Sequence, residues 1–230
     1  MKNKTVFVAC DTSNLSKIKK IIAQTKTKKL KILPKFGLQF FYSKQGRKFL
    51  ENVKSEFWLD LKINDIPQTA VSAIDSLKDL KKCKYITVHA SGGLEMLKAV
   101  KKEAKKINKN IKILGVTVLT SLNNKSLKQI GHTKKIKQLV LKQAGLINLS
   151  SCDGIVCSAQ EALIIRRKYK KLLIVTPGIR LPGDSSNDQK RIMTPVDAFK
   201  NKVTGIVIGR SLTNGNIKNN MKRLIDHLNQ

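Results

Sequence analysis

Residues 57–67 read Phe57-Trp58-Leu59-Asp60-Leu61-Lys62-Ile63-Asn64-Asp65-Ile66-Pro67, an apolar, strand-like run that ends in ionisable side chains. Asp60 and Lys62 are two residues apart, so on a strand both project to the same face. Asp65 follows where Asn64 and Pro67 predict a turn and the start of a helix. Two carboxylates and an ammonium at this spacing predict either a salt bridge at the end of a strand or part of a reactive site.

Outward from this stretch, apolar runs alternate with amphipathic, helix-type segments along the whole chain. Their near-continuous Val, Ile and Leu content is typical of strands that are covered on both faces. Eight such units predict an α/β protein with the (β/α)₈ TIM-barrel fold, as a single domain over residues 1–230. A doubly wound open sheet is the alternative, although no Gly-rich dinucleotide fingerprint follows the first run. The runs lie at residues 5–10, 31–37, 57–62, 85–90, 111–119, 154–157, 172–176 and 205–209.

The chain is strongly basic, with 46 Lys and Arg against 15 Asp and Glu and a net charge of +31. The excess is mostly lysine, spread along the chain at helix-surface spacing, and few aromatic residues interleave with it. Arginine and aromatic side chains are the usual readers of nucleic acids, so we expect solvated helix faces and no nucleic-acid partner. Such a field would still steer an anionic small molecule toward the protein.

The cysteines and the hydropathy pattern indicate where the protein works. The four cysteines form no C-x-x-C pair and have no histidine at metal-ligand spacing, so we expect reduced, packed thiols and no structural metal. No apolar run is long enough to span a bilayer, and the N-terminus lacks the apolar core of a signal peptide. We therefore expect a cytoplasmic protein without a membrane partner. The cysteines are Cys10, Cys83, Cys152 and Cys157.

Unusual polar residues collect where the predicted strands end. In a TIM barrel these carboxyl ends form the face that carries the active site. Two acids and two lysines should converge there and shift each other's pKa. The strand-end residues are Asp11, Lys35, Asp60, Lys62, His89 and Thr120, with Arg180 and Arg210 just after the last two strands.

The last two strand-to-helix loops predict an anion site. Backbone N–H groups around Gly209, next to the Arg210 guanidinium, suit a phosphate. Barrels often bind phosphate at the loops after strands seven and eight. The long polar loop over residues 178–189 has the composition of a mobile lid.

Several motifs together resemble the orotidine 5′-monophosphate decarboxylase family, over essentially the whole span from Asp11 to Arg210. The D-x-K-x-x-D motif of residues 60–65 alone is shared with related phosphosugar decarboxylases and aldolases. The T-P-G-I-R and D-Q-x-R segments are more specific. The matching segments are residues 35–41, 57–67, 175–180, 188–191 and 207–210.

The resemblance implies decarboxylation of orotidine 5′-monophosphate to uridine 5′-monophosphate, without a metal or an organic cofactor. It implies that Lys62 donates a proton to C6 of the pyrimidine, that Asp60 faces the substrate carboxylate, and that Lys35 braces Asp60 and touches the ribose. It further implies a homodimer, with Asp65 and Thr69 reaching into the neighbouring subunit's site.

The remaining implied contacts concern the ribose and the phosphate. Asp11 would bind the ribose, and Thr120 would lie near the pyrimidine and the ribose. The phosphate would be held by Arg180, Gln189, Gly209 and Arg210.

Two other functions remain open from the sequence. A related phosphosugar decarboxylase or aldolase on the same barrel would tend to need Mg²⁺. A basic nucleic-acid-binding protein without catalysis would bind duplex DNA tightly and in a salt-sensitive way.

Overall fold

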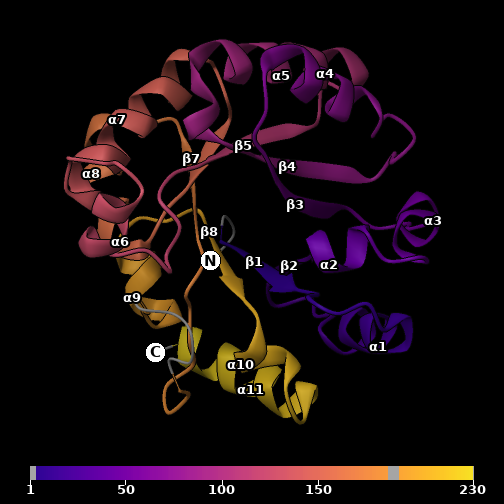
Figure 1. Cartoon of the computed structure of the whole chain (residues 1–230). Helices are drawn as coiled ribbons and strands as arrows, with labels where there is room; N and C mark the ends of the chain where they lie inside the picture. The colour runs from indigo at the N-terminus through magenta and orange to yellow at the C-terminus, as the bar shows by residue number, and fades with distance from the viewer. Residues whose placement is uncertain (1–3, 186–191, 230) are drawn as a thin grey trace.

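The computed structural model describes residues 4–185 and 192–229 and contains a closed barrel of eight parallel strands. Each strand pairs with the next along the chain, and β8 pairs back onto β1 (Figure 1). The closed barrel confirms the predicted TIM barrel and rules out the open sheet. The strands are β1 (Thr5–Ala9), β2 (Lys31–Gly37), β3 (Phe57–Ile63), β4 (Cys83–His89), β5 (Lys112–Val116), β6 (Gly154–Val156), β7 (Leu173–Thr176) and β8 (Gly205–Ile208).

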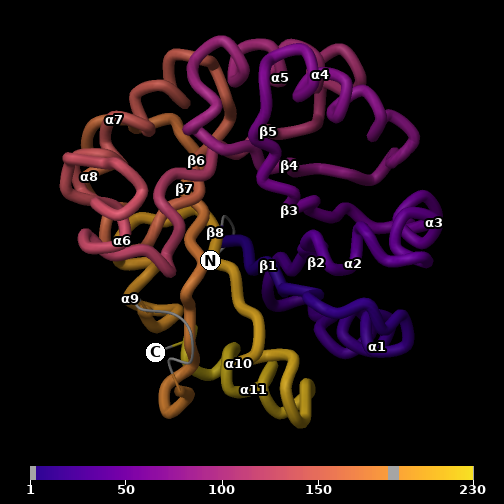
Figure 2. The backbone as a smooth tube through the Cα atoms, viewed as in Figure 1, coloured from indigo at the N-terminus to yellow at the C-terminus, as the bar shows by residue number. Residues whose placement is uncertain are grey.

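Helices surround the barrel, as the tube in Figure 2 shows. The longer ones follow the predicted amphipathic segments, whereas the sequence patterns did not predict the short α2, η1, α9 and α10. The helices are α1 (Leu15–Gln24), α2 (Leu38–Phe41), α3 (Gly46–Glu51), α4 (Pro67–Asp75), η1 (Ala90–Gly92), α5 (Gly93–Ile107), α6 (Asn124–Gln129), α7 (Ile136–Leu149), α8 (Ala159–Lys168), α9 (Pro195–Lys200), α10 (Arg210–Thr213) and α11 (Ile217–Leu228).

Two apolar cores hold these layers together. One lies inside the barrel and includes Phe7, Trp58 and Tyr85, whose rings pack edge to face at centroid distances of 4.8 and 5.2 Å from Phe7. The other lies between the strands and the helices, where the opposite faces of the strands meet residues such as Ile18 and Ile74. Both faces of each strand are therefore buried, which explains the near-continuous apolar runs.

The proline in β2 fits because of the way this strand pairs. Pro34 lies opposite Val8 of β1, but pairing with β3 begins only one residue later, at Lys35 and Trp58. A proline cannot donate to a sheet ladder, so it is tolerated where pairing on one side has not yet begun. This leaves Lys35 in regular strand geometry.

The fifth strand is shorter than the sequence predicts, because it ends at Val116 rather than near residue 119. Its neighbour β6 ends at Val156, opposite Val116, so no partner strand remains on that side. The backbone N–H and the hydroxyl of Thr117 both donate to the Val156 carbonyl, at 3.1 and 3.0 Å. Thr120 consequently lies in the loop after β5 and not at a strand end.

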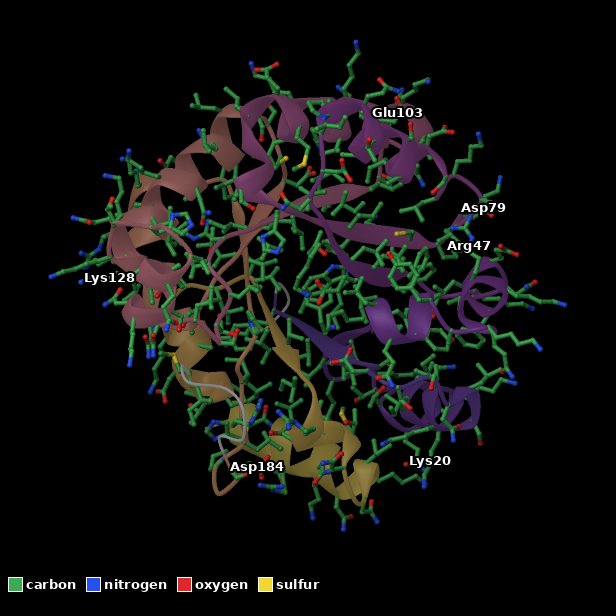
Figure 3. All side chains as sticks on the ribbon, in the orientation of Figure 1. Lys20, Arg47, Asp79, Glu103, Lys128 and Asp184 are labelled. Carbon is green, nitrogen blue, oxygen red and sulfur yellow. The ribbon has the colours of Figure 1, made fainter. Side chains whose placement is uncertain are left out.

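The lysine excess covers the outside of the molecule. In Figure 3 many side chains with nitrogen tips project from the outer helices, and the labelled Lys20 and Lys128 lie at the periphery. Across the described ranges, no helix combines the length and apolar character needed to cross a bilayer.

Candidate active site

Four alternating charges form a continuous array at the mouth of the barrel. Lys35 Nζ lies 3.3 Å from Asp11 Oδ1 and 3.0 Å from Asp60 Oδ2, and Lys62 Nζ lies 2.9 Å from Asp60 Oδ1. Asp11 follows β1, whereas the other three belong to β2 and β3. Gly37 makes room for this array, because a Cβ there would come within 3.0 Å of Asp11 Oδ1. The predicted convergence of two acids and two lysines is confirmed.

The centre of the array is buried and both of its groups stay charged. Burial acts to lower the pKa of Lys35, but the charges of Asp60 and Asp11 outweigh it and raise that pKa. Burial likewise acts to raise the pKa of Asp60, yet Lys35 and Lys62 bring it down to about 2. Opposite charges at hydrogen-bond distance thus overcome the desolvation cost in both cases.

The backbone at Lys62 is unusual and is held by a residue of the next strand. Lys62 has φ 52°, in the left-handed region, where the β3–β4 register shifts between Leu59 and Ile63. Thr87 Oγ1 accepts from Lys62 N at 3.0 Å and donates to Asp60 Oδ1 at 2.9 Å. Such conformations cost roughly 1–3 kcal/mol and persist only where the surroundings enforce them. Thr87 therefore anchors both the Lys62 backbone and the Asp60 carboxylate that pairs with the Lys62 ammonium.

A cavity of about 510 Å³ opens above the barrel core and joins the charge array to two arginines. Its floor includes Trp58, which is 1% exposed and whose ring lies 6.0 Å from Lys35 Nζ. An aromatic face at this distance attracts an ammonium. The cavity is lined by residues of β1, β2, β3, β5, β6 and β8 and of the loops after β5 and β7. Among them are Ala9, Asp11, Lys35, Trp58, Asp60, Lys62, Thr120, Ser121, Pro177, Gly178, Arg180, Gly209 and Arg210.

The arginine end of the cavity is built on loops. Arg180 is only 7% exposed, and its guanidinium donates to the Ser185 carbonyl at 3.2 Å and to the Ile179 carbonyl at 3.0 Å. Burial, together with the charge of Arg210, lowers the pKa of Arg180, while Asp184 opposes the shift. Two guanidinium groups on one wall of a cavity form a site suited to an anion.

The structure brings most of the predicted site residues together, but not all of them. Asp65 and Thr69 are exposed and do not line the cavity, and the Asp65 carboxylate instead accepts from Ile66 N at 2.7 Å. Thr120 lines the cavity from its loop, and Gln189 lies outside the described residues. Lys35 lies two residues before the end of β2 rather than at its end.

The side chains of the site suit an organic anion better than a metal. Within residues 4–185 and 192–229, no three His, Cys, Asp or Glu side chains gather as a metal site would require. All four cysteines are buried. His89, one of the predicted strand-end residues, does not line the cavity. Burial and the charge of Lys62 lower its pKa, although the charge of Asp60 opposes this shift.

Sequence reasoning missed two residues of the site. Thr87 is fully buried and stands in the apolar run of residues 85–88, where a lone polar residue needs a partner. Trp58 shares the inward face of Asp60 and Lys62 by the same two-residue spacing. Both signals were present, but only the closed barrel shows what these residues touch.

Comparisons with known proteins agree with this geometry. A family model described as "Orotidine 5'-phosphate decarboxylase / HUMPS family" matches residues 4–222. The orotidine 5'-phosphate decarboxylase of Fusobacterium nucleatum is 35% identical over 98% of this chain and 95% of its own length. That of Buchnera aphidicola is 43% identical over 81% of this chain and 77% of its own length.

Solved structures give the same fold. The orotidine 5'-phosphate decarboxylase of Lactobacillus acidophilus superposes with a TM-score of 0.82 at 28% identity, covering 98% of this chain and 99% of that one. The Methanocaldococcus jannaschii enzyme, solved with the inhibitor BMP, gives a TM-score of 0.76 at 21% identity and covers 98% of both chains. On the strength of the family model and the curated relatives, the chain belongs to the orotidine 5'-phosphate decarboxylase / HUMPS family.

Proposed function

We propose that this chain, acting as one domain over residues 1–230, decarboxylates orotidine 5′-monophosphate to uridine 5′-monophosphate and carbon dioxide. The observation that carries the proposal is the Asp11–Lys35–Asp60–Lys62 array at one end of a cavity that ends in Arg180 and Arg210. The cavity volume of about 510 Å³ suits a small molecule such as a mononucleotide. The four free, buried cysteines suit a reducing compartment such as the cytosol.

Lys62 is the proton donor in this proposal. Loss of carbon dioxide leaves electron density at C6 of the pyrimidine, and a fixed ammonium beside that carbon stabilises the charge and then supplies the proton. The ion pair with Asp60 and the left-handed backbone at Lys62 place the ammonium before the substrate arrives. A group that is already in place costs no reorganisation during the reaction.

Asp60 faces the substrate carboxylate and Lys35 holds Asp60 in position. The pKa of about 2 keeps Asp60 ionised at neutral pH. Its repulsion of the substrate carboxylate is relieved as carbon dioxide departs, which is a form of ground-state destabilisation. Asp11, which is exposed and bonded to the same Lys35 ammonium, would bind the ribose together with Thr120, which lines the same cavity from the loop after β5.

The phosphate lies at the arginine end. Arg180 and Arg210 supply charge-assisted hydrogen bonds, and Gly209 lets the backbone approach the anion closely. We assign Gln189 to the same group by the family motif. Because the phosphate does not react, its binding energy can improve the transition state by fixing the orientation of the ring.

We further propose that the active unit is a homodimer in which Asp65 and Thr69 complete the partner's site. Both residues are exposed, and Ile66 between them is 66% exposed. Tyr42 and Leu38, which follow the neighbouring strand β2, are 77% and 44% exposed. Large apolar side chains exposed at one rim are typical of an interface.

Mixed subunits test the shared site. Neither Lys62→Ala nor Asp65→Ala alone should turn over substrate, but a random mixture should regain about a quarter of wild-type activity, because each heterodimer holds one intact site. A mixture as inactive as its components would contradict the shared site, and analytical ultracentrifugation would show whether dimers form.

The reaction itself is tested by the loss of orotidine 5′-monophosphate absorbance with the purified protein. We expect uridine 5′-monophosphate and carbon dioxide in equal amounts, with the rate unchanged by a chelator. Activity on a phosphosugar that depends on added Mg²⁺ would instead favour the related decarboxylase or aldolase. Salt-sensitive binding to duplex DNA without turnover would contradict both enzymes.

A further inference from the structure

An arginine of the last helix reaches the segment that carries Arg180. Arg223 lies on α11, and its Nη2 donates to the Pro182 carbonyl at 2.9 Å and to Asp184 Oδ1 at 2.8 Å. One guanidinium therefore binds both the backbone and a side chain of the turn after β7. Figure 3 shows the labelled Asp184 beside α10 and α11, as these contacts require.

The same turn also holds the Arg180 guanidinium. The turn is closed by a bond from Asp184 N to the Leu181 carbonyl at 3.1 Å. Its next residue, Ser185, offers the carbonyl that accepts from Arg180 Nε at 3.2 Å. The position of the guanidinium thus depends on the position of the turn, and the turn is tied to α11 through Arg223.

A cavity of about 220 Å³ behind this turn gathers the charges involved. It is lined by Arg180, Arg210 and Arg223 together with Asp184. Burial acts to raise the pKa of Asp184, but polar contacts with Ser211 and Arg223 and the charges of Arg223 and Arg180 bring it below its ordinary value. A carboxylate that stays ionised keeps attracting both guanidinium groups.

We propose that Arg223 is a positioning residue for Arg180, which it orients through the turn of residues 181–184. This role rests on the proposed function, because it assigns Arg180 to the substrate phosphate. Arg223 does not line the cavity that joins the charge array to the arginines, and its guanidinium bonds to the turn that holds Arg180. Removing it should weaken phosphate binding without touching the charge array.

The experiment compares a ligand that has a phosphate with one that lacks it. We would titrate wild type, Arg223→Ala and Arg223→Lys with uridine 5′-monophosphate and with uridine, and measure Kd by calorimetry. We expect Arg223→Ala to weaken the monophosphate about tenfold and to leave uridine unchanged, since a misplaced Arg180 guanidinium loses about one charge-assisted contact with the phosphate. Arg223→Lys retains the charge but not the paired contacts, so its Kd for the monophosphate should lie between those of wild type and Arg223→Ala.

A matched control and a milder variant keep the test decisive. Arg167→Ala removes an exposed arginine from α8 and should change neither Kd. Asp184→Asn removes the charge of the turn with little change of shape, so it should weaken the monophosphate severalfold even if Arg223→Ala folds poorly. In steady-state kinetics Arg223→Ala and Asp184→Asn should both raise KM for orotidine 5′-monophosphate and leave kcat nearly unchanged.

Equal weakening of both ligands, or no weakening of either, would overturn the role of Arg223. A wild-type protein that binds uridine as tightly as its monophosphate would overturn the phosphate site itself and with it the proposed function. The two failures are therefore distinguishable in one set of titrations.

Discussion

The two ends of the cavity are built in different ways. At one end, Asp11, Lys35, Asp60 and Lys62 lie on or directly after β1, β2 and β3 and hold each other through ion pairs of 2.9–3.3 Å. At the other end, Arg180 lies on a loop after β7, where backbone carbonyl groups hold its guanidinium. The strand end is neutralised by its own ion pairs, whereas the loop end brings two guanidinium groups to one wall of the cavity.

This difference suggests a division of work. Groups that must meet a reacting carbon within a fraction of an ångström belong on rigid elements, and groups that bind a remote anion tolerate a loop. Substitutions at the strand end should therefore reduce kcat for every substrate, and substitutions at the loop end should reduce affinity for phosphorylated substrates only. The following variants test that separation.

The largest effect is expected from Lys62→Ala. This variant loses both the charge that stabilises the carbanion and the proton source, so kcat should fall by about 10⁴-fold or more. The assay is the absorbance loss of orotidine 5′-monophosphate, with Lys128→Ala on α6 as an exposed control. Turnover within about tenfold of wild type would remove Lys62 from the chemistry.

A smaller loss of kcat, about 10²-fold, is expected from Thr87→Val. The change keeps the shape but removes the hydroxyl that bonds Lys62 N and Asp60, so the ammonium would be misplaced. The free energy of unfolding should fall by about 1–3 kcal/mol. Thr25→Val, whose buried hydroxyl donates to Ile21 O at 2.8 Å far from the cavity, should lower stability and leave kcat unchanged.

At the loop end, Arg180→Gln should raise KM for orotidine 5′-monophosphate by about 30-fold, because one charge-assisted contact to the phosphate is lost. Turnover of orotidine, which has no phosphate, should stay the same. A variant that slows both substrates equally would show that Arg180 supports the charge array and would erase the distinction between the two ends.

The smallest effect concerns stability and pH. The pKa of Asp60 is depressed to about 2, so its ion pairs contribute fully above its ordinary pKa of 3.8 and are lost as the pH falls through about 2. The difference in unfolding free energy between wild type and Asp60→Asn should shrink by about 2 kcal/mol from about pH 5 to about pH 2. Urea titrations at each pH measure this free energy of unfolding. As a control, the exposed Asp226→Asn on α11 should differ from wild type by the same amount at every pH.

The strand end was predictable from the sequence and the loop end only in part. The two-residue spacing of Asp60 and Lys62 puts both side chains on one face of any strand, so the sequence alone implies their meeting. Thr87 carries no such spacing to Asp60, and its role depends on the register between β3 and β4. The prediction that Thr120 stands at the end of the fifth strand was wrong, because the short β6 ends the pairing of β5 at Val116.

The hydrophobic periodicity of the sequence does not predict contacts between segments that are far apart along the chain. Arg223 and Asp184 lie on different elements, and nothing in their local sequence links them. The roles of Asp65 and Thr69 stay predictions, because a single chain leaves both exposed and away from the cavity. Gln189 also stays a prediction, since it lies outside the described residues.

The pairing of β8 with β1 also bears on how the molecule is made. Val8 of the first strand lies opposite Ile208 of the last, so the ribosome must release nearly the whole polypeptide before the ring can close. Until then β1 has an unsatisfied edge, and contacts this distant in sequence form slowly. A nascent chain that stalls before β8 would thus expose an unpaired, aggregation-prone edge of β1 and would lack the β8 residues that line the cavity. The segment that carries β8 is therefore needed both to avoid aggregation during synthesis and to complete the binding site.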